Sequence, residues 1–277
     1  MSMRFAVLLV TFDVLALREA TFGDMLDEST SLNRFPRDKR LLAAIFDVDG
    51  VLVASPHERA WREALVGYAN SARFTTDFYQ AHVAGKPRLD GARCALEKLG
   101  VPNAAAHART YAEKKQALID QLIAEGNFKA FPDAVRLALA LKSAGLLLAL
   151  ASSSKNVGPM LRRLTSPDGR SLLEVFDVDL SGRDVPRGKP DPAIFLLAAR
   201  ALNIPASQCL VVEDAPSGIK AARAGGMAAL GIARLGDEDL LLQAGADLVL
   251  TSLDQLDVRV VANGILRMLQ PEKPTDA

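Results

Sequence analysis

The 277-residue chain has few cysteines, few aromatic side chains, no excess of either charge sign and no long apolar run. Its two cysteines, Cys94 and Cys209, cannot build a disulfide scaffold, so free thiols in a cytoplasmic protein are expected. Aromatic residues make up only 5%, which argues against platforms that stack single-stranded nucleic acid. Lys plus Arg and Asp plus Glu both number 33, so the net charge gives no general attraction to nucleic acids or acidic membranes.

Membrane insertion and secretion are also disfavoured. The most apolar N-terminal run, residues 5–12, is far shorter than the ~20 residues that span a bilayer, and Asp13 ends it. Charged residues interrupt the region where a secretory signal would need its apolar core, and no small-residue cleavage site follows. We therefore expect a cytoplasmic monomer whose partners are small molecules, with no nucleic acid and no membrane among them.

Apolar runs alternate with helical patterns along most of the chain. Strands buried on both faces are predicted at residues 41–46, 146–151, 210–212, 228–232 and 247–250. Helices are predicted at 133–144, 191–202 and 217–224, the second with Asp191 as N-cap and Pro192 in its first turn. This alternation predicts an α/β fold, a doubly wound parallel sheet of the Rossmann type.

A long strand-poor stretch separates the first strand from the second. It carries helical patterns at residues 58–69, 92–99 and 105–123, and a structureless loop of that length would be unusual. We therefore expect an all-helical cap at 54–128, inserted into a core formed by 41–53 and 129–266. Residues 1–40, with one amphipathic helix at 13–26, are expected to be an appendage, and 267–277 a flexible tail.

Polar side chains follow the predicted strands where each one ends. Asp47 and Asp49 follow the first, the run 152–156 (Ser-Ser-Ser-Lys-Asn) follows the next, and Glu213 and Asp214 follow a later one. Lys189 precedes the helix at 191–202. Ligands of open parallel sheets bind beyond the carboxyl ends of the strands. Carboxylates, hydroxyls and a lysine gathered there predict a site for a hard cation such as Mg²⁺ together with a phosphate.

Four separated motifs resemble those of the haloacid dehalogenase-like superfamily of phosphotransferases, over about residues 41–256. They are Phe-Asp-Val-Asp-Gly-Val at 46–51, Ala-Ser-Ser-Ser at 151–154, Gly-Lys-Pro-Asp-Pro at 188–192 and Val-Glu-Asp at 212–214. One Asp-x-Asp is weak evidence, but four motifs in the family's order are specific. The resemblance implies that Asp47 is the nucleophile, forming an aspartyl-phosphate, and that Asp49 is the general acid/base.

The same resemblance implies a Mg²⁺ site and a phosphate cradle. The metal ligands would be Asp47, the backbone carbonyl of Asp49, Glu213 and Asp214, with the alternative that Glu213 only neighbours the ligands. Mg²⁺ and Lys189 would mask the repulsion between the nucleophile and the phosphate. Ser152 would hold phosphoryl oxygens, although a hydroxyl that only caps a turn is the alternative. Asp49 must keep a proton for the leaving oxygen, so its pKa is expected to lie above that of Asp47.

The inserted segment resembles the helical cap of the β-phosphoglucomutase subgroup. His57 and Trp61 match its His-x-x-Ala-Trp element, Arg88 lies in a Gly-Lys-Pro-Arg loop, and Lys115 matches a lysine that partners the histidine. In the subgroup the loop arginine grips the non-transferring phosphate, and the run matching Ser153, Ser154, Lys155 and Asn156 binds phosphate. Surface roles for Arg88, Lys115 and His57 and a cap-core role for Trp61 are the alternatives.

Two features depart from the subgroup's pattern. Ala54 stands where an acidic residue is usual, and the spacer from Asp49 to His57 is shorter than in the best-known mutases. The leading interpretation is a Mg²⁺-dependent β-phosphoglucomutase interconverting β-D-glucose 1-phosphate and glucose 6-phosphate, with a sugar bisphosphate as activator. The alternatives are a phosphatase of small sugar phosphates and a catalytically silent binder, and the presence of both Asp47 and Asp49 argues against the binder.

Overall fold

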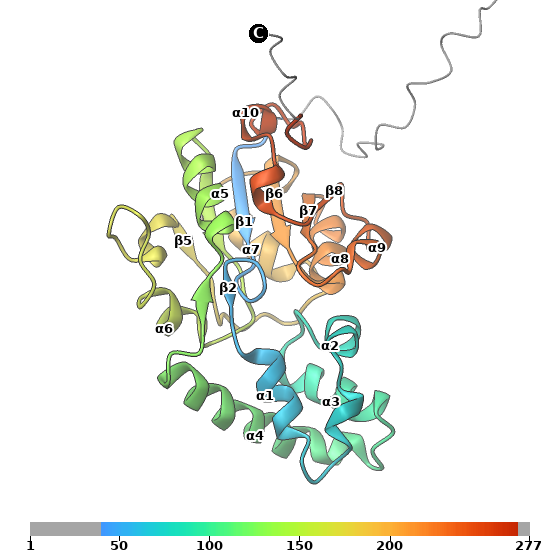
Figure 1. Cartoon of the computed structure of the whole chain (residues 1–277). Coiled ribbons are helices and arrows are strands. Elements are labelled where there is room, and N and C mark those ends of the chain that lie inside the picture. Colours follow the sequence, from blue (N-terminus) through green and yellow to red (C-terminus); the bar gives the residue numbers. More distant parts are fainter. Residues whose placement is uncertain (1–39, 271–277) are drawn as a thin grey trace, which may run out of the picture. The chain divides into compact units, whose positions relative to one another are not determined.

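The computed structural model describes residues 40–270, so the helix expected at 13–26 and the end of the tail lie outside the described residues. Six parallel strands form one sheet in the order β5-β4-β1-β6-β7-β8 (Figure 1). Their bounds are β1 Ala43–Phe46, β4 Leu147–Leu150, β5 Val178–Asp179, β6 Cys209–Glu213, β7 Ala228–Ile232 and β8 Leu248–Leu250. The doubly wound parallel α/β fold predicted from the sequence is confirmed.

Helices cover both faces of this sheet, as the apolar strands require. Ala44 and Phe46 of β1 pack into one hydrophobic cluster, whereas Ala43 and Ile45 pack into another. The first cluster includes residues of α5 (Pro132–Ser143), α6 (Val157–Leu161) and α10 (Val258–Val261). The second includes residues of α7 (Ala193–Ala201), α8 (Pro216–Ala224) and α9 (Glu238–Gln243). Alternate residues of the central strand thus anchor the two helical layers.

The segment between β1 and α5 forms four helices and its own hydrophobic cluster (Figure 1). They are α1 His57–Ala64, α2 Thr76–His82, α3 Arg88–Lys98 and α4 Ala104–Ala124. The chain leaves the sheet through β2 (Val53–Ala54) and returns through β3 (Lys129–Ala130), and these two short strands pair antiparallel. We refer to residues 54–128 as the cap segment.

Most predicted elements agree with the structure to within a few residues, although the structure also contains short elements that were not predicted, among them β2, β3, α6, α9 and α10. The helix expected at 58–69 ends at Ala64. Helix α2 and strand β5 were not predicted, because α2 has only seven residues and β5 only two, too few to show a period. The expected N-cap of α7 was wrong, because Pro192 and not Asp191 occupies that position. Asp191 lies one residue earlier, and its side chain accepts a hydrogen bond from the Ala193 amide at 3.0 Å.

Among residues 40–270, no helix combines the length and the apolar character that crossing a membrane requires.

Candidate active site

Side chains from three strand ends meet at the carboxyl edge of the sheet. Asp47 follows β1, Ser152 follows β4 and Asp214 follows β6, and all three line one cavity of about 300 Å³. The Asp47 amide donates to the Val212 carbonyl at 3.0 Å, which continues the β1–β6 ladder by one residue. The parallel topology therefore gathers residues that lie far apart in the sequence.

Lys189 joins the nucleophile candidate to a second carboxylate. Its Nζ lies 2.5 Å from Oδ1 of Asp47 and 2.6 Å from Oε1 of Glu213. Burial alone would lower the pKa of Lys189, but Asp47 and Glu213 outweigh burial and hold that pKa above its usual value. Lys189 is therefore a permanent buried cation at the Asp47 carboxylate.

The contacts of Glu213 favour the second of its two expected roles. Its Oε1 faces Lys189, and its Oε2 accepts the backbone amides of Asp214 and Ala215 at 3.0 and 2.9 Å. The side chain is fully buried against Gly218, where a Cβ would come within 1.8 Å of Oε1. With both oxygens engaged, Glu213 orients Lys189 instead of facing the cavity as a metal ligand.

Asp47 and Asp214 are carboxylates in an unfavourable electrostatic setting. Burial raises the pKa of Asp47 to about 7 even though Lys189 opposes the shift. Burial, together with Glu213 and Asp47, raises the pKa of Asp214 well above its ordinary value. Gly50 allows this crowding, because a Cβ there would lie 1.9 Å from Oδ2 of Asp214 and its φ of +87° favours glycine. A further positive charge near Asp47 and Asp214 would therefore stabilise their ionised forms.

A Mg²⁺ ion fits this donor set. Within residues 40–270, no three His, Cys, Asp or Glu side chains are grouped to hold a metal by themselves. Mg²⁺ usually takes one or two carboxylates and completes its shell with water and phosphate oxygens. Asp47, Asp214 and the backbone carbonyl of Asp49 could hold it, and a bound cation would lower the pKa values of both carboxylates.

Asp49 is linked to the cap segment through His57. His57 Nε2 lies 3.3 Å from Oδ1 of Asp49, and His57 Nδ1 lies 2.6 Å from Nζ of Lys115. Burial lowers the pKa of His57 and lowers that of Lys115 to about 7. A protonated Lys115 can only donate to Nδ1, which leaves the imidazole proton on Nε2, an atom that lies 3.3 Å both from Asp49 Oδ1 and from Ser154 Oγ. Despite the short spacer, the fold brings the three side chains together.

The expected order of the two aspartate pKa values is reversed. Burial raises the pKa of Asp49, but His57, Ser55 and Lys115 together outweigh burial and lower it below its usual value. The pKa of Asp47, by contrast, is raised. The physical reason is that His57, Ser55 and Lys115 outweigh burial at Asp49, whereas at Asp47 burial, together with the neighbouring carboxylates Glu213 and Asp49, outweighs Lys189. The sequence-based expectation for Asp49 was therefore wrong for the protein without bound ligands.

The loop after β4 is held by its own hydroxyls. Ser152 Oγ accepts the Ser154 amide at 3.2 Å, and Ser154 Oγ accepts the Asn156 amide at 3.3 Å. Ser154 Oγ also lies 3.3 Å from Nε2 of His57. Ser153 and Lys155 line the same cavity, and Nζ of Lys155 pairs with Asp184 at 3.3 Å. The hydroxyls thus shape the loop in addition to facing the cavity.

Arg88 and Trp61 both line the cavity from the cap segment. Arg88 begins α3 and donates through Nη1 to Oε1 of Gln116, whose Nε2 donates to Oδ1 of Asn156 at 3.1 Å. Trp61 is buried, and its ring lies 5.2 Å from the Tyr111 ring at a tilt of 53° and 5.1 Å from Nζ of Lys115. Arg88 is therefore tied to the loop after β4, while Trp61 mainly belongs to the cap's hydrophobic cluster.

Several cavity residues were missed from the sequence. Gln116 follows Lys115 directly, so the motif around Lys115 offered a signal for it. Tyr79 belongs to α2, which was not predicted, and so does its neighbour Gln80, which hydrogen-bonds to the cavity residue Asp214. Asp184 lies in an irregular loop that no pattern marks. These side chains are found only when the fold brings their segments to the cavity.

A parallel α/β core with a buried aspartate–lysine–glutamate cluster at its carboxyl edge and a helical segment over it is typical of enzymes that transfer phosphoryl groups through an aspartate. A model of the haloacid dehalogenase-like hydrolases matches residues 41–226. The chain belongs to this family of enzymes.

Relatives in the family carry different activities. The chain is 32% identical to a β-phosphoglucomutase of Bacillus subtilis, over 79% of this chain and 93% of the relative. It is 33% identical to a phosphorylated carbohydrates phosphatase of Thermotoga maritima, over 74% of this chain and 91% of the relative. The crystal structure of an archaeal β-phosphoglucomutase from Pyrococcus matches with a TM-score of 0.64 and 33% identity, covering 80% of this chain and 99% of that one. The resemblance to the family and to the β-phosphoglucomutase type is thus confirmed.

Proposed function

We propose that the protein is a Mg²⁺-dependent phosphotransferase that forms an aspartyl-phosphate on Asp47, and that it interconverts β-D-glucose 1-phosphate and glucose 6-phosphate. The observation that carries this proposal is one cavity lined by the nucleophile candidate Asp47 at the sheet and by the cationic side chain of Arg88 at the cap segment. Lys189 and Asp47 lie at the sheet, while Arg88 and Lys115 line the cavity from the cap segment. A mutase needs such a second anion site, because its sugar bisphosphate intermediate must be held in two orientations.

The transfer step follows from the positions of Asp47 and Asp49. A carboxylate oxygen of Asp47 attacks phosphorus, the bond from phosphorus to the sugar oxygen breaks, and Asp49 gives a proton to that oxygen. Mg²⁺, when bound, would neutralise charge on the transferring phosphoryl oxygens. Lys189 opposes the same charge from the buried side. In the reverse sense, Asp49 takes the proton of the sugar hydroxyl that attacks the phosphoenzyme.

The cap contacts support transfer to a sugar in preference to water. His57 lies 3.3 Å from Asp49, and Lys115 contacts His57, so side chains of the cap segment form part of the surroundings of the acid/base group. Arg88 is linked through Gln116 to Asn156 on the other side of the cavity. A closed cap excludes water and positions the acceptor hydroxyl, which favours isomerisation over hydrolysis.

A phosphatase of small sugar phosphates is the second candidate. Lys155, which belongs to the run expected to bind phosphate, pairs with Asp184 at 3.3 Å, and this pairing reduces the positive charge available to a second phosphate. Relatives named as phosphatases are as similar to this chain as the mutases. Both candidates use Asp47 and Asp49 in the same roles, so they differ only in whether a sugar hydroxyl or water receives the phosphoryl group.

Product fate separates the two candidates. The protein is incubated with Mg²⁺ and a panel of phosphorylated sugars, and both isomer formation and inorganic phosphate are measured. A mutase produces glucose 6-phosphate from β-D-glucose 1-phosphate and is stimulated by catalytic amounts of glucose 1,6-bisphosphate. Stoichiometric release of phosphate with no isomer would establish the phosphatase instead. Asp47→Asn should remove both turnover and the phosphoenzyme, and a phosphoenzyme that persists in this variant would reject Asp47 as the nucleophile.

A further inference from the structure

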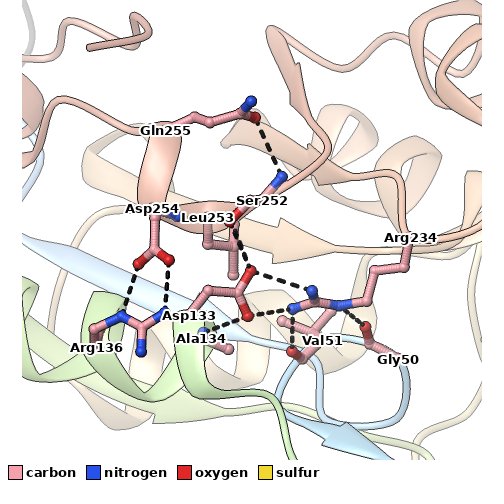
Figure 2. Close-up of polar contacts among 10 residues, drawn as sticks. All are labelled: Gly50, Val51, Asp133, Ala134, Arg136, Arg234, Ser252, Leu253, Asp254 and Gln255. Carbon is pink, nitrogen blue, oxygen red and sulfur yellow. Dashed lines mark hydrogen bonds and ion pairs between the residues drawn. The ribbon is translucent and has the colours of Figure 1, made fainter.

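Arg234 follows β7 and binds the turn that comes directly after Asp49. Its Nε donates to the Gly50 carbonyl at 2.9 Å, and its Nη2 donates to the Val51 carbonyl at 3.0 Å (Figure 2). The side chain is only 15% exposed. A guanidinium presents donors in a rigid plane, so it can hold two successive carbonyls in one orientation. Nothing in the motifs discussed above marks this residue.

The opposite side of the guanidinium is held by Asp133 at the start of α5. Nη1 and Nη2 each donate to a different Asp133 oxygen at 3.1 Å, a bidentate pair. Asp133 in turn accepts the backbone amides of Ala134 and Leu253, both at 2.9 Å (Figure 2). The Phe131 ring lies 3.7 Å from the guanidinium carbon. Arg234 therefore cannot move without losing its two hydrogen bonds to Asp133, a carboxylate that two backbone amides also hold in place.

This arrangement touches both connections between the core and the cap segment. Gly50 donates to the Val53 carbonyl, and Phe131 donates to the Leu52 carbonyl, each at 2.9 Å. Val53 of β2 pairs with Ala130 of β3. Arg234 thus contacts the outgoing chain just before β2 and the returning chain just after β3, where any cap movement must be absorbed.

A second cavity, of about 180 Å³, lies beside Asp49, and Arg234 lines it together with Tyr79 and Gln80. The arginine therefore occupies space next to the acid/base residue without lining the cavity that holds Asp47. Its contacts with the reaction are indirect, through the backbone of Gly50 and Val51.

We infer that Arg234 is a positioning residue for Asp49: it holds the turn after Asp49 in the orientation that lets this side chain deliver its proton, and it anchors that turn to the base of the cap. The inference rests on the proposed function, since it assumes that Asp49 is the general acid/base. A positioning role predicts a selective defect. Steps that need the Asp49 proton should slow, whereas attack by Asp47 on a substrate with a good leaving group should not.

The test compares two phosphoryl donors in rapid-mixing experiments with Mg²⁺ present. Phosphoenzyme formation from glucose 6-phosphate needs protonation of a sugar oxygen, whereas the burst of p-nitrophenol from p-nitrophenyl phosphate does not. Arg234→Lys replaces the planar fork by one ammonium, which cannot hold two carbonyls and a carboxylate together. We expect it to slow the sugar phosphate reaction roughly 10- to 100-fold and the burst by less than about threefold.

Arg136→Ala is the matched control. Arg136 lies on α5 and forms a bidentate pair with Asp254 in the same region (Figure 2), but both side chains are about half exposed and neither touches the Asp49 turn. Its two rates should stay within about twofold of the unsubstituted protein, in line with the small contribution of surface ion pairs. Circular dichroism and the unfolding midpoint of each variant show whether it is folded.

If Arg234→Lys does not fold, Asp133→Asn replaces it, because it removes the charge that holds the guanidinium and predicts the same selective loss. Equal slowing of both reactions, or no slowing of either, overturns the positioning role. If the unsubstituted protein forms no phosphoenzyme from either donor, the proposed function fails, and the inference fails with it. The two failures are therefore distinguishable.

Discussion

At the site, the buried carboxylates outnumber the cationic side chains that contact them. Asp47, Glu213 and Asp214 lie close together, and Lys189 is in contact with the first two. Unpaired buried charge is costly, so each carboxylate must be neutralised by a neighbour, a bound cation or a proton. The pKa values of Asp47 and Asp214 are raised because the site lacks enough positive charge to stabilise both ionised carboxylates. The site is therefore suited to Mg²⁺, which can neutralise the carboxylates and bind a phosphate at the same time.

Lys189→Met should lower turnover at least about 100-fold, since it removes the buried cation that opposes phosphoryl charge. Steady-state kinetics at saturating Mg²⁺ measure the loss. Lys142→Met is the control, because Lys142 forms a partly exposed ion pair with Asp177, outside the cavity lining. Turnover within tenfold of the unsubstituted protein would show that Lys189 is not needed for charge stabilisation.

Arg88→Ala should slow isomerisation at least about 30-fold while changing hydrolysis of p-nitrophenyl phosphate by less than about threefold, because only the bisphosphate needs a second cationic grip. Coupled assays of glucose 6-phosphate and of p-nitrophenol give the two rates. Arg93→Ala on the same helix is the control, since Arg93 makes only an exposed pair with Asp90. Equal losses on both substrates would demote Arg88 to a general structural role.

Among the secondary-structure elements, the start of α5 carries a polar network that lies outside the cavity. Asp133 lies in the first turn of α5 and binds the Leu253 amide, the Ala134 amide and Arg234 (Figure 2). An acidic residue at this position also interacts favourably with the helix dipole. One carboxylate thereby ties α5 to the loop after β7 and to the 3₁₀ turn Leu253–Gln255.

The stability of this junction should depend on pH. Burial raises the pKa of Asp133, but Arg234 and the two amides outweigh burial and hold it below 3.8. A carboxyl with a lowered pKa contributes stability that is fully present above its unfolded pKa and is lost as pH falls through its folded pKa. Denaturant midpoints between pH 6 and pH 3 should therefore fall less steeply in Asp133→Asn than in the unsubstituted protein.

The same substitution should destabilise the protein at pH 7 by about 2–3 kcal/mol, because it weakens charge-assisted hydrogen bonds to Arg234 and to two amides. Denaturant unfolding at pH 7 gives this value, with Arg136→Ala as the control expected to cost less than about 1 kcal/mol. If the denaturant midpoints of Asp133→Asn and of the unsubstituted protein fall equally steeply with pH, Asp133 does not cause the loss of stability in acid.

At the scale of the whole molecule, residues from both the core and the cap segment line the candidate active site. The core provides Asp47, Lys189 and Asp214, while the cap segment covers them with His57, Arg88 and Lys115. Ser217 Oγ of α8 donates to the Ala84 carbonyl at 2.9 Å, which joins the cap loop directly to the core. Substrate exchange therefore requires these contacts to open and re-form.

Mg²⁺ should stabilise the folded protein. Binding at 100 times its dissociation constant contributes about 2.7 kcal/mol, which for a chain of this size raises Tm by roughly 5–10 °C. Thermal unfolding with Mg²⁺ and with a chelator measures the shift, and turnover should vanish in the chelator. Asp214→Asn should lose most of the shift, so an undiminished shift in this variant would exclude Asp214 as a ligand.

The sequence alone predicts the fold class and the group of candidate catalytic residues. Buried strands are continuous apolar runs, and the polar residues that end them must share one edge of a parallel sheet, so local patterns were sufficient to predict Asp47, Asp49, Ser152 and Asp214 at one site. Lys189 was predicted from a different signal, its place in a loop motif before a helix. None of these predictions needed knowledge of distances.

The electrostatic interactions among these residues, and the side chains that support them, became visible only in the folded protein. The role of Glu213, the reversed pKa order of Asp47 and Asp49, and the contacts of Gln80 and Arg234 depend on which segments pack together. Burial and pairing are properties of the three-dimensional environment, because a carboxylate's pKa reflects neighbours far away in sequence. Periodicity records which face of an element is buried, but it carries no information about the side chain that arrives from another element.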